Sequence, residues 1–221
     1  IINIIKMSDV GVKNCNDCID IESVKTRNIT LAITGTANAA AVAEHVMFMI
    51  LNISKGKEMY DKCVRAGEFK TRNQLPQVIE LWNKKILIAG FGRVGQSLIK
   101  RCKGFEMDVY VIDPFVEKNK IQSLGGKKVD AIDSIVADID YISLHMPINE
   151  KTKNMINFDL MKKMKNTCII INTARGGIIN EGDLNKALNE NIIYGAGLDV
   201  FENEPPSNNN PLLKNKKVFL S

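Results

Sequence analysis

The sequence predicts an α/β protein with a doubly wound parallel sheet, and three observations carry this prediction. From Ile86 onward, short apolar runs alternate with segments of helical period, which is the element order of a parallel sheet. The first run, 86–89, continues directly into the G-x-G-x-x-G motif of residues 90–95. The next run, 109–112, ends at Asp113, and this spacing of strand, glycine-rich turn, helix and acid is typical of a Rossmann-type βαβ unit.

The other elements follow from local patterns in chain order. Apolar runs predict the strands Ile86–Ala89, Val109–Ile112, Lys128–Val129, Tyr141–Leu144, Cys168–Ile171, Gly195–Asp199 and Lys217–Leu220. Helical patterns predict helices at Gly95–Lys103, Val116–Leu124, Ile132–Ala137, Phe158–Met164 and from Asn180 through Asn189. Asn180 stands three residues before Asp183, which is close to a capping box.

The N-terminal part has a different pattern. Ile1–Lys6 predicts a strand that begins abruptly, and because the first residue is not Met we expect the natural N-terminus to lie further upstream. Ala37–Asn52 is apolar or small around nearly its whole circumference. It therefore predicts a helix that is buried in the core or at a subunit interface.

Composition limits the class of protein. The chain has 221 residues, 45% hydrophobic and 25% charged, which is enough to bury a sizeable core. The net charge of +5 is dispersed among acids, which argues against a nucleic-acid partner, and no apolar run approaches the ~20 residues of a membrane span. Without a signal-peptide pattern and with an odd number of cysteines, we expect a cytoplasmic protein. Cys15 and Cys18 form a C-x-x-C that lacks a second ligand pair, so we expect no metal site.

The glycine-rich turn predicts a dinucleotide site. Gly90 permits the tight turn, Gly92 lets the backbone approach a pyrophosphate, and Gly95 lets helix and strand pack closely. The pyrophosphate then lies at the helix N-terminus, where free N–H groups and the dipole favour an anion. Asp113 ends the second strand, where a carboxylate binds a ribose 2′-OH and repels a 2′-phosphate, so the sequence favours NAD over NADP. A turn-forming role for Asp113 before Pro114 is the alternative, and the two roles are compatible.

Ligands of an open α/β sheet bind at the carboxyl ends of its strands, and the segments 143–147, 172–177 and 198–206 lie there. Arg175 closes an apolar strand, where a guanidinium can hold a carboxylate with two parallel bonds; a surface salt bridge is the alternative. Asp199 and Glu204 follow the next strand. Such a carboxylate can orient a histidine and raise its pKa, although each acid alone is more typical of a solvated surface.

The chain has two histidines that could exchange a proton with a substrate hydroxyl. His45 lies in the predicted helix 37–52, where a structural role is favoured. His145 ends a central strand, so it is the histidine whose predicted position suits proton exchange. Pro147, two residues later, favours instead a turn that lines the cofactor.

Together these motifs resemble the D-isomer-specific 2-hydroxyacid dehydrogenase family, and most closely its phosphoglycerate dehydrogenase branch. The resemblance spans nearly the whole chain in order, through the segments 38–45, 90–95, 111–115, 143–147, 172–184 and 197–205. It implies a Rossmann-type NAD-binding domain at residues 36–221, preceded at residues 1–35 by a remnant of a flavodoxin-like substrate domain. It also implies hydride transfer between NAD and a D-2-hydroxy or 2-keto acid, by a homodimer or larger homo-oligomer.

The resemblance implies individual roles as well. Arg175 would bind the substrate carboxylate and carbonyl oxygen, Glu204 would pair with a catalytic histidine, and Asp199 would bind the nicotinamide carboxamide. The backbone amides of Gly11 and Val12 would hold the substrate carboxylate. The other cofactor contacts would come from Gly90, Gly92, Arg93, Val94, Gly95, Asp113, His145, Met146, Pro147, Thr173, Ala174 and Arg175.

The chain departs from the family pattern at several points. The family's catalytic histidine follows a proline after a strand like 217–220, so we expect it beyond Ser221, and neither histidine of the chain matches it. A chain without that residue is expected to have little or no turnover. Asp9 stands where glycine is usual, and the segment 15–18 resembles a small insertion, so we expect the geometry of the substrate loop to depart from the family pattern.

Three alternatives stay open at this point. Another 2-hydroxyacid reductase, acting on hydroxypyruvate or glyoxylate, would share these motifs. Formate dehydrogenases share the architecture but have Gln where this chain has Glu204, which argues against them. A non-catalytic NAD-sensing module, similar to the C-terminal binding protein co-repressors, would differ mainly in the N-terminal region.

Overall fold

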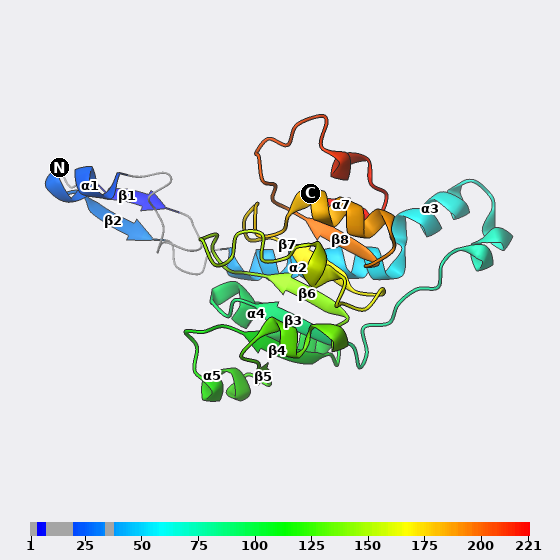
Figure 1. The fold of residues 1–221 in the computed structure, drawn as a ribbon, viewed down its shortest axis with the longest axis horizontal. Coiled ribbons are helices and arrows are strands. Elements are labelled where there is room, and N and C mark those ends of the chain that lie inside the picture. The colour runs from blue at the N-terminus through cyan, green and yellow to red at the C-terminus, as the bar shows by residue number, and fades with distance from the viewer. Residues whose placement is uncertain (1–3, 8–19, 34–37) are drawn as a thin grey trace.

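The computed structural model describes residues 4–7, 20–33 and 38–221, and its centre is a seven-stranded parallel sheet (Figure 1). The strands lie in the order β5-β4-β3-β6-β7-β8-β9. Their bounds are β3 Lys85–Ala89, β4 Asp108–Ile112, β5 Lys127–Lys128, β6 Tyr141–Leu144, β7 Ile169–Asn172, β8 Gly195–Leu198 and β9 Val218–Leu220. The predicted doubly wound Rossmann sheet is confirmed, and each strand boundary lies within one residue of its prediction.

The order of the strands reverses at β3. Ala89 at the end of β3 pairs with Ile112 of β4 on one side and with Leu144 of β6 on the other. Successive strands then extend outward in both directions from this pair. The carboxyl ends of β3 and β6 therefore form a topological switch point, the place where open α/β sheets bind their ligands.

Helices cover both faces of the sheet. On one face, α2 (Ala39–Lys55) and α4 (Arg93–Gly104) pack against each other and share a core with Ile86 and Ile88. On the other face, Leu87 and Ala89 belong to the core formed with α6 (Phe158–Met161) and α7 (Glu181–Asn189). Because side chains alternate along a strand and both faces are covered, the central strands read as continuous apolar runs.

The helix α2 is buried in the core of the chain along one side. Ala43, Val46 and Ile50 have no exposed surface, whereas Phe48 on the opposite side is 51% exposed. The helix also runs to Lys55, three residues beyond the prediction, and ends at Gly56, whose φ of +58° is the left-handed conformation of a helix terminus. One side of α2 is therefore core, and the other remains at the surface.

A small βαβ unit precedes the main sheet. β1 (Ile4–Met7) pairs in parallel with β2 (Thr30–Ile33), and α1 (Ile21–Thr26) connects them. This unit lies at one end of the molecule in Figure 1, with the main sheet at the centre. The predicted substrate contacts Gly11 and Val12, together with Asp9, Cys15 and Cys18, lie outside the described residues.

An arm that the sequence analysis missed extends at the other end of the molecule (Figure 1). It consists of α3 (Lys57–Arg65) and the 3-10 helix η2 (Phe69–Gln74). Along the arm Met59, Val64 and Phe69 are 43%, 47% and 52% exposed. No helix in the described part of the chain has the length and apolarity needed to cross a membrane.

Two predicted helices are shorter than expected. The segment 132–137 forms two 3-10 turns, η3 (Ile132–Ser134) and η4 (Val136–Asp138), because Ile135 between them has a φ of −133° that interrupts a helix. The predicted helix 158–164 ends at Met161, after one turn. The helix predicted at 116–124 forms as α5 (Lys118–Ser123), and Asn180 caps α7 by accepting a hydrogen bond from the Asp183 N–H, as predicted.

Candidate functional site

The glycine-rich turn connects β3 to α4 at the switch point. Gly90 has a φ of +96°, and a Cβ atom there would lie 2.5 Å from the carbonyl oxygen of His145. A Cβ on Gly95 would overlap the Gly90 carbonyl oxygen, whereas a Cβ on Gly92 would meet nothing within 4 Å. Gly92 is the N-cap of α4 and supplies no side-chain cap, so the N–H groups of the first turn, around Arg93 and Val94, point out of the helix. The turn therefore has the backbone cradle of an anion site.

Asp113 closes this cradle from the end of β4. Its Oδ2 accepts a hydrogen bond from the Phe91 N–H at 2.7 Å, and its Oδ1 accepts one from the Phe115 N–H at 2.8 Å. The turn-forming role considered for Asp113 is therefore present in the structure. Each carboxylate oxygen has a second lone pair, so a ribose hydroxyl can still bind there.

The end of β6 packs against the glycine-rich turn. The His145 N–H donates to the Ala89 carbonyl at 2.7 Å, and its Nε2 lies 2.8 Å from the Ser143 Oγ. Surrounding protein lowers the pKa of His145 to about 4, so the ring is neutral at physiological pH. An imidazole with this pKa is a poor proton acceptor at neutral pH. The position of His145 instead suits a lining residue of the site, together with Met146 and Pro147.

The loop after β7 places Arg175 at the carboxyl end of the parallel strands. Asn172 holds this loop, since its side chain donates to the Arg175 carbonyl at 2.9 Å and accepts from the Ala174 N–H at 3.0 Å. The exposed Arg175 guanidinium donates to the Ala174 carbonyl at 2.7 Å. Among the described residues, Thr173 Oγ1 is the one buried side-chain oxygen or nitrogen without a hydrogen-bond partner. A buried polar atom left unpaired is costly and indicates a missing ligand or water.

The loop after β8 carries Glu204 and is held by two sets of contacts, one to the Arg175 loop and one to Glu181. A Cβ on Gly176 would overlap the Phe201 carbonyl oxygen, so this loop and the Arg175 loop pack backbone against backbone. Glu204 Oε1 accepts a hydrogen bond from the Phe201 N–H at 3.1 Å. The carboxylate of Glu204 is thereby held by its own loop.

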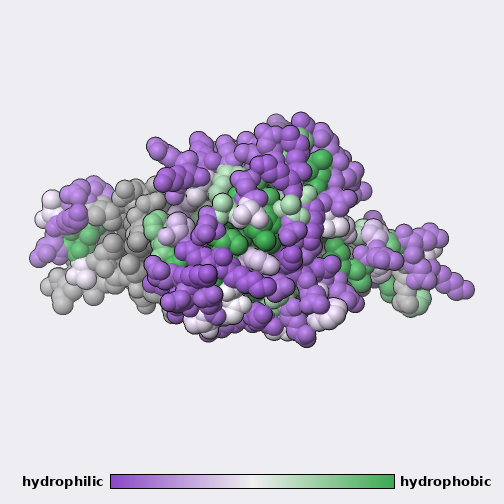
Figure 2. Space-filling view, turned by 60° about the horizontal axis from the view of Figure 1, so that its bottom comes forward, coloured by the Kyte–Doolittle hydropathy of each residue, from purple (hydrophilic) through white to green (hydrophobic). Residues whose placement is uncertain are grey.

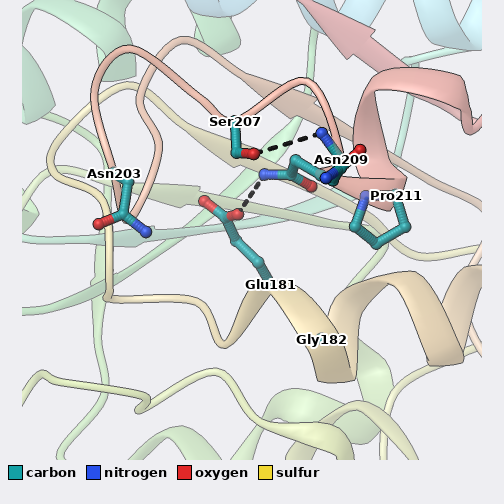
Figure 3. A pocket seen from close by; sticks show the side chains of 7 residues that line it. Glu181, Gly182, Asn203, Ser207, Asn209 and Pro211 are labelled. Atoms are coloured by element: carbon teal, nitrogen blue, oxygen red, sulfur yellow. Dashed lines mark hydrogen bonds between the residues drawn. The ribbon is translucent and has the colours of Figure 1, made fainter.

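Glu181, at the start of α7, fastens the same loop further along. Its Oε1 accepts from the Glu202 N–H at 2.6 Å and its Oε2 from the Asn210 side chain at 2.6 Å, while its own N–H donates to the Glu202 carboxylate at 3.1 Å. Figure 3 shows the Glu181 carboxylate reaching up from the helix into the loop, which ends at η5 (Pro211–Lys214). Asn203 and Ser207 line a cavity of about 300 Å³ beside Glu181.

Asp199 and Ser221, which directly follow β8 and β9, meet His45 from the middle of α2. The Ser221 Oγ donates to the Asp199 Oδ1 at 3.1 Å, and the His45 Nε2 lies 2.8 Å from the Ser221 Oγ and 3.9 Å from the Asp199 Oδ1. Sequence reasoning assigned His45 a structural role and missed this cluster. The available signal was an imidazole on a mostly apolar helix, where a partly buried polar group needs a polar partner.

The predicted site residues within the described part of the chain thus gather at one edge of the sheet, on the turns after β3, β4, β6, β7 and β8. Within the described ranges, no cluster of three or more His, Cys, Asp or Glu side chains is arranged to hold a metal ion. The arrangement offers a backbone cradle for phosphates, an acid for a ribose and an exposed guanidinium for a carboxylate.

Comparison with known proteins connects this arrangement to one family. The family model described as "D-isomer specific 2-hydroxyacid dehydrogenase, NAD binding domain" matches residues 47–221. The D-3-phosphoglycerate dehydrogenase of Archaeoglobus fulgidus is 37% identical over 213 residues, which cover 96% of this chain and 39% of that protein. The glyoxylate reductase of Thermococcus litoralis is 36% identical over 210 residues, covering 93% of this chain and 63% of that protein.

A solved structure has a similar fold. The NAD-dependent formate dehydrogenase of Staphylococcus aureus, in complex with NAD, superposes with a TM-score of 0.80 at 27% identity, covering 99% of this chain and 64% of that chain. The chain spans about two fifths of the length of the phosphoglycerate dehydrogenase that it matches.

Proposed function

The chain belongs to the D-isomer specific 2-hydroxyacid dehydrogenase family, through its NAD-binding domain, and we propose that it binds NAD in a protein that oxidises or reduces a D-2-hydroxy or 2-keto acid. The observation that carries this proposal is the glycine-rich turn at the switch point, closed by Asp113. Its backbone fits a dinucleotide pyrophosphate, and its acid favours the unphosphorylated ribose of NAD.

The residues present fit NAD at both ends of the site. The space beside Gly92 and the uncapped start of α4 accommodate the pyrophosphate. The unpaired Thr173 Oγ1 at the end of β7 offers a hydrogen bond to the cofactor, and Asp199 offers an acceptor to the nicotinamide carboxamide. His145, Met146, Pro147 and Ala174 line the space between them. When bound, NAD supplies the acceptor or donor of the hydride.

The substrate side is proposed from Arg175 and Glu204. Arg175 holds the substrate carboxylate and polarises the adjacent carbonyl through its guanidinium. Glu204 orients a histidine that exchanges the hydroxyl proton and that we expect beyond Ser221. Gly11 and Val12, outside the described residues, contribute backbone amides to the substrate carboxylate. Residues 1–35 then belong to the substrate domain and residues 36–221 to the NAD-binding domain.

We propose 3-phosphoglycerate as the hydroxy acid, on the strength of the similarity to phosphoglycerate dehydrogenases. Reduction of glyoxylate or hydroxypyruvate is the second candidate, supported by the comparable similarity to a glyoxylate reductase. A non-catalytic NAD sensor is the third, and we rank it lower because the exposed Arg175 guanidinium is suited to hold a substrate carboxylate.

The first test is calorimetric titration of the 221-residue chain and of Asp113→Ala with NAD and NADP. We expect the chain to bind NAD in preference to NADP, and the variant to bind NAD about 10- to 100-fold more weakly. Asp108→Ala, at the opposite end of β4, is the matched control and should leave NAD affinity unchanged. A chain that is folded by circular dichroism but binds neither cofactor would contradict the proposal.

We also propose a homodimer located in the cytoplasm. Figure 2 shows a mostly hydrophilic face with hydrophobic side chains gathered near its middle. The exposed Phe48 on α2 and the exposed apolar side chains of the arm are the candidate contacts. Phe48→Glu should therefore lower the mass measured by light scattering, whereas Met47→Lys, at a position 5% exposed, should lower the melting temperature. Unchanged mass in Phe48→Glu would exclude α2 as the interface.

A further inference from the structure

We propose that His45 and Ser221 are positioning residues that hold the Asp199 carboxylate in the orientation that binds the nicotinamide carboxamide. The proposal rests on the proposed function, because it takes NAD as the ligand and Asp199 as the acceptor. It assigns the imidazole of α2, which the similarity to the family leaves without a role, to the recognition of one group of the cofactor.

The hydrogen-bond directions in this cluster are fixed by counting protons. The Ser221 hydroxyl has one hydrogen, and it donates that hydrogen to Asp199 Oδ1. The 2.8 Å contact between Ser221 Oγ and His45 Nε2 therefore requires His45 to donate. A chain of two hydrogen bonds then runs from the imidazole N–H through the hydroxyl to the carboxylate.

The cluster engages one oxygen of the carboxylate. Both the Ser221 hydroxyl and the His45 ring approach Oδ1, at 3.1 Å and 3.9 Å. The Asp199 side chain is 38% exposed, so without these contacts it would sample several solvated rotamers. Holding Oδ1 fixes the direction of Oδ2, and a preoriented acceptor binds an amide N–H without a further loss of side-chain entropy.

Aromatic packing holds the imidazole itself. The His45 ring stacks on Phe48 with centroids 6.0 Å apart, and Phe48 packs edge-on against Phe219 of β9 at 5.4 Å. The contact between His45 and Phe48 orients the imidazole donor. Phe219 is two positions before Ser221, so the contact between Phe48 and Phe219 ties α2 to the strand that leads to the hydroxyl. The ring is therefore placed by packing as well as by its hydrogen bond.

The test measures which part of the cofactor each variant affects. His45→Phe keeps an aromatic ring against Phe48 and removes the donor, Ser221→Ala removes the bridge, and His45→Gln keeps an N–H donor. Each chain is titrated with NAD, with ADP-ribose, which lacks nicotinamide, and with the NAD analogue whose carboxamide is replaced by acetyl, which lacks the amide N–H. Melting temperature is recorded for every variant.

We expect His45→Phe and Ser221→Ala to bind NAD about tenfold more weakly, while their affinities for ADP-ribose and the acetyl analogue stay unchanged. His45→Gln should recover most of the NAD affinity. The double variant should be no weaker than either single one, because both residues act through one chain of hydrogen bonds. The control is Glu44→Gln, on the same helix as His45, which weakens the ion pair of Glu44 with Arg101 of α4 and should match the unmodified chain.

Equal weakening of all three ligands would overturn the proposal, since it would indicate a general structural role. Unchanged NAD affinity in both single variants would overturn it too. If His45→Phe does not fold, Ser221→Ala decides by the same criteria. If the unmodified chain binds neither NAD nor ADP-ribose, the proposed function fails as well. If the unmodified chain binds both ligands but the variants weaken NAD and ADP-ribose equally, only this inference fails.

Discussion

The two halves of the candidate site are built in different ways. Around β3 and β4, the cradle consists of backbone, with Gly90 packed on the His145 carbonyl and Asp113 bonded to two N–H groups. Around β7, β8 and β9, the site consists of side chains, and Asp199 and Glu204 are held by hydrogen bonds at an exposed surface. At Gly90 and Gly95 the first half leaves no room for a Cβ atom, whereas the carboxylates of the second half are held by hydrogen bonds that can be removed one at a time.

Gly90→Ala breaks the backbone half and should have the largest effect. The residue has a φ of +96°, and the new Cβ would lie 2.5 Å from the His145 carbonyl oxygen. We expect a loss of about 3 kcal/mol or more in the free energy of unfolding, together with loss of NAD binding. Urea denaturation measures the first and calorimetry the second.

The matched control is Gly104→Ala, at the last residue of α4. A Cβ there would meet nothing within 4 Å, and alanine has the higher helix propensity. Its stability should stay the same or rise slightly. Similar stability of the two variants would show that the cradle does not require the close approach of Gly90.

The pH dependence of stability tests the boundary between the two halves, because His145 directly follows β6, the strand between them. Its pKa of 6.5 in the unfolded chain is lowered to about 4 by the surrounding protein. The unfolded chain therefore binds more protons between pH 4 and 6.5, and stability is present above pH 6.5 and is lost as the pH falls towards 4. The lowered pKa corresponds to at most roughly 3 kcal/mol, and to less because the residue as a whole is only partly buried.

His145→Asn removes the titrating group and keeps a polar side chain beside Ser143. Urea denaturation at a series of pH values should therefore give a shallower slope for this variant in the same interval. Carboxylates titrate in both chains and cancel in the difference. Superimposable curves for the two chains would indicate that His145 is solvated in the folded protein.

Glu181 tests the side-chain half. Glu181→Ala removes the acceptor of the Glu202 N–H and of the Asn210 side chain, and with them an acid in the first turn of α7. We expect a loss of about 1 to 2 kcal/mol and faster proteolysis of the loop 201–211, because these are partly exposed hydrogen bonds. Glu181→Gln keeps one acceptor, so its stability should lie between those of the unmodified chain and Glu181→Ala.

Glu190→Ala, at the other end of α7, serves as the comparison for Glu181→Ala. Its side chain is exposed, so the substitution should change stability by less than about 0.5 kcal/mol. If both alanine variants leave the loop equally resistant to protease, the hydrogen bonds to Glu181 do not hold it in solution.

The same contrast explains what the sequence could predict. The cradle was predictable because its requirements are local: glycine spacing, an apolar strand and Asp113 lie within one βαβ unit. The cluster of His45, Ser221 and Asp199 was not, because His45 and Ser221 are 176 residues apart and meet only when α2 packs beside β9. No local pattern encodes a contact of that sequence separation.

The fold shows the same division. Strand positions followed from apolar runs, because strands buried on both faces leave no ambiguity. The arm was missed because α3, Lys57–Arg65, is mostly polar and has one buried side chain, Cys63. The expected helix at 132–137 was wrong because six residues give too few turns to separate an α-helix from two 3-10 turns.

Thr173→Val should have the smallest effect on stability, and it should stabilise the chain, whereas most substitutions destabilise. The buried Thr173 Oγ1 has no partner in the protein, so replacing the hydroxyl by a methyl group of similar volume removes an unpaired polar atom. We expect the free chain to gain up to about 1 kcal/mol of stability, while NAD affinity falls by about fivefold because the cofactor loses a hydrogen bond. Urea denaturation without cofactor and calorimetry with it measure the two effects separately, and Thr152→Val, whose hydroxyl is bonded to the Pro147 carbonyl at 2.8 Å, should be destabilised instead. A loss of stability in Thr173→Val would mean that water already pairs with the hydroxyl, and the nicotinamide side would then be as preassembled as the glycine-rich cradle.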